Sequence, residues 1–283
     1  MTNTVVHTHI KKVEAGGIID TNDILASEEP LEIRLVHGLS HNRRQQNISV
    51  TMRTPGQDKE LAAGFLFTEG IITAQEDILD IILSENEDGS IATVQLKTMV
   101  TPKLDNTQRN FKSTAACGVC GKTEMSSIHT GVHVSNESAS TFSAALLYQL
   151  PDKLRREQAV FEATGGLHAA ALFDTSGNLL ILREDIGRHN AVDKLIGAAM
   201  AQQLMPLHSH LLLLSGRAGF ELIQKAAMAN IPVIAAVGAP SSMAVKTAGE
   251  WNITLVGFLR EQRFNIYTAA ERITITHKSS YHG

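Results

Sequence analysis

Residues 211–259 read "LLLLSGRAGFELIQKAAMANIPVIAAVGAPSSMAVKTAGEWNITLVGFL" and decide the fold class. Short apolar runs alternate here with longer helical segments; the predicted strands are 211–216, 232–238 and 253–259, and the predicted helices 218–230 and 242–251. The strands are apolar throughout, as parallel strands covered on both faces must be. Strands that alternate with helices form parallel sheets through crossover connections. The stretch therefore predicts an α/β fold with a three-layer α/β/α sheet.

The residues just before this stretch add a hairpin and more helices. Residues 167–173 and 179–184 are strand-like and flank the turn "DTSGN", which predicts a β-hairpin. Helices are predicted over 138–150, 152–164 and 189–204. The first two are separated at Pro151, because proline cannot continue a helix interior.

The N-terminal part predicts a smaller α+β region. Residues 31–38 and 47–54 alternate apolar and polar side chains, as half-buried strands do. A helix is expected over 58–72 with Asp58 as its N-cap, and "NEDGS" at 86–90 is turn-like. The predicted domains are a flexible tail (1–12), the smaller region (13–112), and a cysteine loop with the main domain (113–283).

Composition excludes several classes of protein. The chain has 283 residues, 43% hydrophobic and 19% charged, with a formal net charge of −4. These are ordinary globular values, and they give no basic patch of the nucleic-acid-binding type. No apolar run approaches the ~20 residues of a membrane span, and the N-terminus lacks a secretory pattern. We therefore expect a cytoplasmic protein that binds neither nucleic acid nor membrane.

The stretch "STAACGVCG" at 113–121 holds the only two cysteines, Cys117 and Cys120. In a reducing cytosol, such a pair favours catalysis, redox chemistry or metal binding over a structural disulfide. Zinc would need two further ligands, and His129 and His133 are candidates, with a spacer shorter than usual. A thioredoxin-like couple usually has apolar residues or proline between its cysteines, whereas this pair is surrounded by small residues.

Sulfur transfer is the third interpretation of this pair. A cysteine can carry a terminal sulfur as a persulfide, provided that donor and acceptor can both reach it. The glycines around Cys117 and Cys120 allow close approach of a partner, and Lys122 favours the thiolate. Two buried structural thiols are the remaining alternative, although free buried cysteines usually lie among larger apolar residues.

Several glycine- and arginine-bearing turns predict an anion site. Gly216 and Arg217 follow one predicted strand, residues 237–244 follow the next, and Arg260 and Arg263 follow the last. These turns are expected at the carboxyl edge of the parallel sheet, where open α/β sheets bind ligands. Arginine pairs with phosphate through two hydrogen bonds. A further junction, "REDIGRHNAVDKLIG" at 183–197, contributes Arg188 and His189 at a helix start. We expect a phosphorylated ligand.

Six segments resemble, in order, the FdhD family of formate dehydrogenase accessory sulfurtransferases. They are "CGVCGK", "ATGGLHAAAL", "REDIGRHNAVDKLIG", "SGRAGFE", "AVGAPSSMAV" and "LVGFLREQRFNIYT", and the likeness spans roughly 13–275. The resemblance implies a fold similar to cytidine deaminases and a homodimer. Deaminase activity itself is not expected, since it needs His-x-Glu, and His168 is followed by two alanines.

The resemblance also implies a function. Such proteins accept persulfide sulfur from a cysteine desulfurase and pass it to the molybdenum cofactor, bis-molybdopterin guanine dinucleotide, before its insertion into formate dehydrogenase. Cys117 is then the expected persulfide carrier, and Cys120 assists or is a second acceptor. The cofactor-binding stretch maps onto Phe258, Leu259, Arg260, Glu261, Gln262 and Arg263. A guanine nucleotide is the expected mimic of the cofactor, and no resident metal is expected.

Two other classes of function remain open. One is a zinc-stabilised binding protein that uses Cys117, Cys120, His129 and His133, which would contain stoichiometric zinc. The other is a chaperone that carries the cofactor without transferring sulfur, for which the cysteines would be dispensable.

Overall fold

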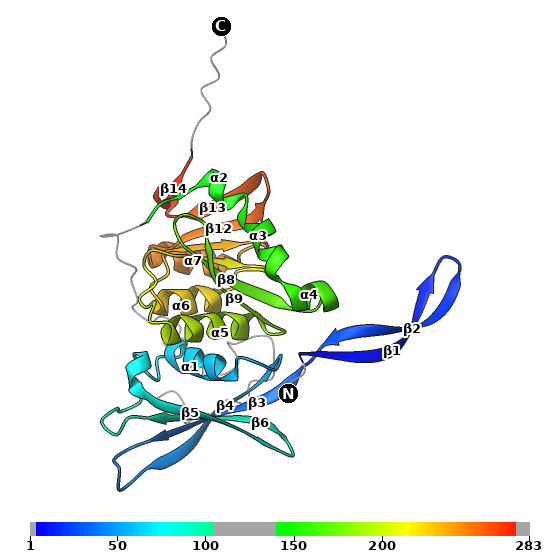
Figure 1. The fold of residues 1–283 in the computed structure, drawn as a ribbon. Coiled ribbons are helices and arrows are strands. Elements are labelled where there is room, and N and C mark those ends of the chain that lie inside the picture. Colours follow the sequence, from blue (N-terminus) through cyan, green and yellow to red (C-terminus); the bar gives the residue numbers. More distant parts are fainter. Residues whose placement is uncertain (1–3, 105–139, 276–283) are drawn as a thin grey trace. The chain divides into compact units, whose positions relative to one another are not determined.

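A computed structural model describes residues 4–104 and 140–275 (Figure 1). The chain forms two compact units, each built from separate stretches of sequence. The first unit is Met1–Ile128, Gln158–Ala169 and Arg183–Ala201, and the second is His129–Glu157, Ala170–Leu182 and Gln202–Gly283. These units do not follow chain order as the predicted domains do, and the predicted boundary at 112 lies outside the described residues.

The first unit contains a four-stranded sheet in the order β4-β3-β6-β5. Its strands are β3 (Glu29–His37), β4 (Arg44–Arg53), β5 (Ile78–Asn86) and β6 (Gly89–Leu96), and a 3-10 turn, η1 (Gln75–Asp77), precedes β5. Leu31, Ile33 and Leu35 of β3 are fully buried, and the residues between them are partly exposed. The predicted alternation is thus confirmed for the strand at 31–38, as is the turn between β5 and β6. The predicted strand at 47–54 is present as part of β4, but its burial does not alternate: Ile48 is an extra residue at a shift in the β3–β4 register, and both Ile48 and Ser49 are buried.

Two helices of the first unit pack at very short range. They are α1 (Asp58–Thr68) and α5 (Arg188–Ala201). A Cβ atom on Gly64 would overlap the carbonyl oxygen of Asp193, and one on Gly197 would overlap that of Glu60. Glycine at these two positions therefore permits the close approach. The prediction that Asp58 caps α1 is wrong: Gln57 is the N-cap, and Asp58 instead accepts hydrogen bonds from Arg53.

A two-stranded hairpin occupies most of the predicted N-terminal tail. Strands β1 (Val5–Glu14) and β2 (Gly17–Ala26) pair without interruption from Val5↔Ala26 to Glu14↔Gly17. The prediction of an irregular tail over 1–12 is therefore wrong for residues 5–12. Most side chains of the hairpin are exposed on both faces, so its sequence lacks the alternation by which a strand is recognised. Figure 1 shows the hairpin extending from the sheet of its unit.

A six-stranded mixed sheet has the order β13-β12-β11-β10-β8-β9. Its strands are β8 (His168–Phe173), β9 (Leu179–Asp185), β10 (Leu211–Leu214), β11 (Val233–Ala236), β12 (Thr254–Arg260) and β13 (Arg263–Thr268). The sheet belongs to the second unit except for residues 168–169 of β8 and 183–185 of β9, which belong to the first. Strands β10, β11 and β12 are parallel, as predicted, and β10 and β11 are buried throughout. Strand β8 runs antiparallel to β10 and β13 runs antiparallel to β12, so the sheet is mixed. The α/β class is confirmed.

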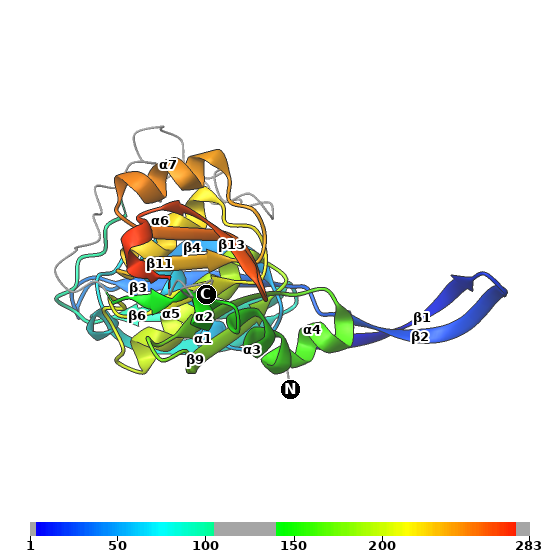
Figure 2. The ribbon, with the colours of Figure 1, turned by 90° about the horizontal axis from the view of Figure 1, so that it is seen from above.

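Helices α6 (Phe220–Met228) and α7 (Ser242–Glu250) make the two crossovers of this parallel core. Crossovers between parallel strands are almost always right-handed, so two that progress in the same direction place both helices on one face of the sheet. The rings of Phe220 and Trp251, at the ends of the two helices, have centroids 6.5 Å apart. The helices lie side by side in both views (Figure 2).

The helices predicted over 138–164 are shorter and more numerous than expected. They are α2 (Ala144–Leu147), α3 (Leu150–Glu157) and α4 (Ala159–Thr164), the last in the first unit. Pro151 lies in the first turn of α3, where its missing N–H costs nothing. Strand β7 (Phe142–Ser143) pairs with β14 (Ile273–Thr274), which follows the 3-10 turn η4 (Ala270–Arg272). Within the described residues, no helix is long and apolar enough to cross a membrane.

Candidate functional site

Three polar turns meet at the carboxyl ends of β10, β11 and β12, in the second unit. The amide of Gly238 donates to the carbonyl oxygen of Gly216 at 2.9 Å, and the amide of Phe258 donates to that of Gly238 at 3.0 Å. Ala218 and Pro240 form one more parallel bridge between the first two turns. The hydrogen-bond ladder of the sheet thus continues beyond its strands. This geometry brings Gly216 and Arg217 to the same sheet edge as residues 258–263, as the sequence predicts.

Glycine is required at two positions along this edge. A Cβ atom on Gly238 would lie 2.9 Å from the oxygen of Gly216 and 3.0 Å from the amide nitrogen of Arg217. A Cβ atom on Gly257 would lie 2.7 Å from Cδ of Pro240 and 3.0 Å from Cε2 of Tyr267. Real Cβ atoms essentially never come within 3.0 Å of another heavy atom, so a side chain at either position would force the turns apart.

Phe258 has an unusual backbone at the end of β12. Its φ is +54°, a conformation that bulky residues rarely adopt, and its side chain is 43% exposed. Such strain persists only where the surrounding structure enforces it, and it is concentrated at functional sites. The two residues next to Phe258 differ from it, since Gly257 and Leu259 are buried. Of the predicted cofactor stretch, the Leu259 side chain therefore belongs to the core and cannot contact a ligand.

Arginines surround these turns. Arg260 donates from Nη1 to the carbonyl oxygens of Val237, at 2.7 Å, and Leu259, at 3.0 Å. This contact joins the ends of β11 and β12 and leaves the other guanidinium nitrogens of Arg260 available. Arg217 and Arg263 are exposed, and neither has an ion-pair partner among residues 4–104 and 140–275. Glu261 and Gln262 are exposed in the hairpin turn between Arg260 and Arg263. The edge thus offers three cationic groups to an anion.

The predicted anion site at 183–197 has a different role for most of its residues. The Lys194 ammonium group lies 2.7 Å from the Asp185 carboxylate, and both side chains are fully buried. Asn190 donates to Asp185 at 3.0 Å and to the carbonyl oxygen of Met52 at 2.8 Å. Arg183 donates to Glu60 at 2.7 Å. These polar side chains hold the first unit together.

Arg188 and His189 begin α5, where both are half-buried. They belong to the first unit, whereas the three turns belong to the second. The binding role of Arg188 and His189 therefore stays a prediction.

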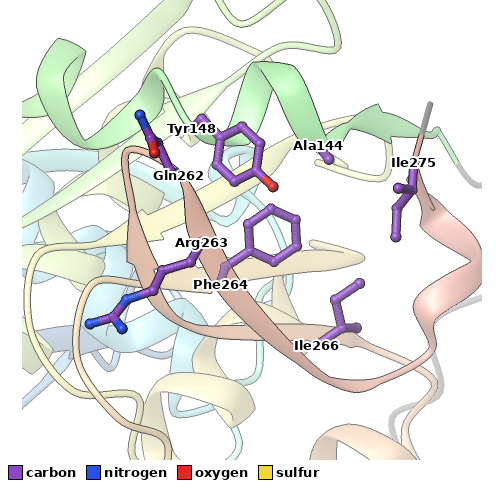
Figure 3. A pocket seen from close by; sticks show the side chains of 7 residues that line it. All are labelled: Ala144, Tyr148, Gln262, Arg263, Phe264, Ile266 and Ile275. Carbon is purple, nitrogen blue, oxygen red and sulfur yellow. The ribbon is translucent and has the colours of Figure 1, made fainter. Parts of the chain in front are cut away.

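An open apolar cleft of about 470 Å³ lies beside β13 (Figure 3). The rings of Tyr148 and Phe264 stand tilted at its centre, with centroids 5.4 Å apart. Its full lining is Ala144, Tyr148, Gln262, Arg263, Phe264, Ile266 and Ile275. Figure 3 shows the Arg263 guanidinium group pointing away from the two rings. The guanidinium group of Arg263 therefore does not point into this cleft.

The cysteine pair lies outside the described residues. This applies to Cys117, Cys120, His129 and His133 alike, so the structure neither supports nor contradicts the zinc alternative. Within residues 4–104 and 140–275, no group of three or more His, Cys, Asp or Glu side chains is arranged to hold a metal ion.

Sequence reasoning missed two residues of this edge, Asn265 and Tyr267. Both side chains are exposed on β13, which the sequence did not predict as a strand. The alternation within "RFNIYT" was the signal that could have revealed it.

Comparison of the sequence with known proteins identifies a family to which the chain is similar. Residues 26–274 match the model of the FdhD/NarQ family, a span that includes both cysteines and the three turns. The chain is 50% identical to the sulfur carrier protein FdhD of Mycolicibacterium paratuberculosis over 93% of this chain and 97% of that protein. It is 43% identical to the sulfur carrier protein FdhD of Picrophilus torridus, over 89% of this chain and 92% of that protein.

The fold has a counterpart among crystal structures. A structure described as a formate dehydrogenase accessory protein from Desulfotalea psychrophila superimposes with a TM-score of 0.75. The alignment covers 96% of this chain and 100% of the other, at 23% identity, which bears on the fold alone. From the family match and the identity to its curated relatives, we conclude that this chain belongs to the FdhD/NarQ family.

Proposed function

We propose that this protein is a sulfurtransferase that carries sulfur as a cysteine persulfide and delivers it to the molybdenum cofactor of formate dehydrogenase. The observation that carries the proposal is the 50% identity, over 93% of the chain, to a protein named a sulfur carrier. The Cys117-x-x-Cys120 pair lies within the matched span and is the only source of thiols in the chain. A carrier needs a thiol, and no other residue can supply one.

The first step is transfer of sulfane sulfur from a cysteine desulfurase. The Cys117 thiolate attacks the terminal sulfur of the desulfurase persulfide. One S–S bond forms on Cys117 as the donor S–S bond breaks, and the desulfurase cysteine leaves as a thiolate. The exchange needs no external oxidant or reductant. Cys120 follows Cys117 by three residues in the sequence, and in this proposal it assists Cys117 or accepts the sulfur from it.

The second step returns Cys117 to its starting state. Delivery would break the Cys117 S–S bond and return the Cys117 thiolate, while the released sulfur bonds to the acceptor. The acceptor would supply the two electrons that reduce this sulfur to sulfide and would itself be oxidised by two electrons. The acceptor in this proposal is bis-molybdopterin guanine dinucleotide, bound as a substrate. The protein's part is to hold the nucleotide ends while the sulfur is transferred.

The sheet edge of the second unit suits such a nucleotide. Phosphates carry the negative charge that Arg217, Arg260 and Arg263 complement, and arginine binds phosphate through paired hydrogen bonds. Gly216 and Gly238 keep side chains away from the backbone there, and the exposed ring of Phe258 offers a surface for a base. These features support placing the guanine dinucleotide on this edge, where a free guanine nucleotide should bind as a mimic.

The proposal includes two partner proteins and a compartment. A cysteine desulfurase is the donor, and formate dehydrogenase without sulfurated cofactor is the acceptor enzyme. We also propose that the protein acts in the cytoplasm as a homodimer, which rests on the family resemblance.

The test is activation of formate dehydrogenase in cells that lack this protein. Cys117→Ala should abolish activation, while GDP binding to the purified variant stays at the wild-type value. Full activation by Cys117→Ala would contradict the carrier role and favour a chaperone that only transports cofactor. Stoichiometric zinc in the purified protein, lost in both cysteine variants together with the fold, would instead support the zinc-stabilised binding protein.

A further inference from the structure

Two aromatic side chains are exposed among residues 4–104 and 140–275, and both lie in the β12–β13 hairpin. Phe258 is 43% exposed and Tyr267 is 37% exposed. The other aromatic side chains of the described residues are buried or half-buried. An aromatic side chain that stays partly exposed forgoes part of the stabilisation that full burial gives, so two of them in one hairpin make it a candidate binding surface.

Each of these aromatic residues lies at an irregularity in the hairpin register. Leu255 pairs with Thr268 and Val256 pairs with Ile266, so Tyr267 is an extra residue in β13. Gly257 pairs with Asn265 and Arg260 with Arg263, which leaves Phe258 and Leu259 opposite a single residue of β13. Bulges of this kind re-aim a side chain and are frequent beside functional sites. Tyr267 keeps the phase of its strand, in which Arg263, Asn265 and Tyr267 are the exposed positions.

The ring of Tyr267 is held in place by its neighbours. Its Cε2 atom lies 3.0 Å from the point where a Cβ of Gly257 would stand, and Cδ of Pro240 lies 2.7 Å from the same point. The ring thus rests against a backbone position where only glycine fits. Asn265 also reaches the Tyr267 hydroxyl oxygen, at 3.5 Å. A supported ring that remains exposed is preorganised for contact with a ligand.

The charges around this ring indicate what the ligand carries. Arg260 and Arg263 come from the same hairpin, and Arg263 is exposed without an ion-pair partner in the described part of the chain. Tyr267 and Arg263 are both exposed positions of β13 and therefore share one face of the strand. An aromatic ring and an arginine on one face suit a planar base that bears phosphate. Acidic side chains would be expected beside the ring if the ligand were a cation, and Glu261 alone offers one in the hairpin turn.

We propose that Tyr267 is a base-stacking residue, which receives the guanine ring of the bound dinucleotide while the arginines hold its phosphates. The inference rests on the proposed function, since that places the cofactor on this sheet edge. It adds Tyr267, outside the stretch 258–263, to the residues that bind the ligand. It also explains why Gly257 is needed: a side chain there would displace the tyrosine ring.

The test compares nucleotide with pyrophosphate binding by calorimetry. Tyr267→Ala should weaken GDP binding by about 5- to 150-fold, the loss of one base stack, and leave pyrophosphate affinity unchanged. Tyr267→Phe keeps the ring and should bind GDP as the wild type does. The control is Leu180→Ala, which removes a side chain of similar exposure, 39%, from the opposite edge strand β9 and should change neither affinity.

Two results would overturn the role of Tyr267 and leave the proposed function intact. One is wild-type GDP affinity in Tyr267→Ala. The other is an equal loss of GDP and pyrophosphate binding in that variant, which would make Tyr267 a support for the hairpin instead of a stacking residue. If the wild-type protein itself bound no GDP, the proposed placement of the cofactor would fail as well, and the inference with it.

Discussion

Lys194 and Asp185 form an ion pair of 2.7 Å from which solvent is fully excluded. The ammonium group also donates to the carbonyl oxygens of Thr54, at 2.8 Å, and Glu184, at 3.4 Å. The carboxylate accepts from the amides of Thr54, at 3.2 Å, and Gly187, at 2.8 Å. All of these residues belong to the first unit. The pair therefore ties α5 to the residues that follow β4 and to the end of β9.

Lys194→Met should destabilise the protein strongly. The substitution leaves the Asp185 carboxylate buried without its cation, and breaking such a pair costs about 3–5 kcal/mol. Urea denaturation measures the change. The control is Lys246→Met in the exposed pair with Glu250, 3.9 Å apart, which should change the free energy of unfolding by less than about 0.5 kcal/mol. Equal effects of the two substitutions would contradict a structural role for Lys194.

Gly64→Ala should separate helices α1 and α5. The new methyl group would overlap the carbonyl oxygen of Asp193, and inserting atoms into a packed contact costs about 1–3 kcal/mol or more. Gly249→Ala in α7 is the matched control, because its nearest heavy atom would be Cγ2 of Thr268 at 3.5 Å, an ordinary contact. That variant should be as stable as the wild type or slightly more so, since alanine favours helix. Thermal unfolding compares the two.

Arg263→Ala should weaken binding of GDP. The exposed guanidinium group is available for a phosphate, and charge-assisted hydrogen bonds of this type contribute about 1.5–3 kcal/mol, or about 10- to 150-fold in affinity. Arg44→Ala removes the same charge at the exposed start of β4, in the first unit, and should leave the affinity unchanged. An unchanged affinity in Arg263→Ala would count against the proposed cofactor site.

His210 should make the stability of the protein depend on pH. Burial lowers the pKa of His210, and the neighbouring His208 lowers that pKa further. As pH falls below the unfolded value of about 6.5, the unfolded chain takes up a proton that the folded chain does not. The contribution of neutral His210 to the free energy of unfolding is therefore fully present above about pH 6.5, the usual pKa of histidine in the unfolded chain. It is lost as the pH falls toward the lower pKa that His210 has in the folded state. His210→Gln should show a smaller loss of melting temperature between pH 7.5 and 5 than the wild type; parallel curves would refute this.

The parallel core could be predicted because its sequence reflects its environment. Strands β10 and β11 are buried on both faces and therefore apolar at every position, and the helices between them have clear ends. The hairpin of β1 and β2 could not be found in this way. Neither of its faces is consistently buried, so residues such as Lys11, Lys12 and Val13 follow no period. What defines it is pairing between strands, which local patterns do not encode.

The site was predictable only in part for a similar reason. The glycine and arginine turns at 216–217 and 258–263 follow strands directly, and strand order alone brings them together. The segment at 183–197 looked equally functional, because buried structural ion pairs use the same residue types as ligand sites. Lys194 and Asp185 could be told from binding residues only by their burial. Tyr267 was missed because β13 itself was not predicted, although the alternation within "RFNIYT" would have placed Tyr267 on the exposed face of that strand.

The most direct test of the central claim is mass spectrometry of the protein after incubation with a cysteine desulfurase and cysteine. The peptide 113–122, "STAACGVCGK", should gain about 32 Da, the mass of one sulfur atom. Cys120→Ala should retain the added mass and Cys117→Ala should lose it. An unmodified peptide 113–122 in the wild-type protein, under conditions in which the desulfurase itself carries persulfide, would contradict the proposal that this protein is a sulfur carrier.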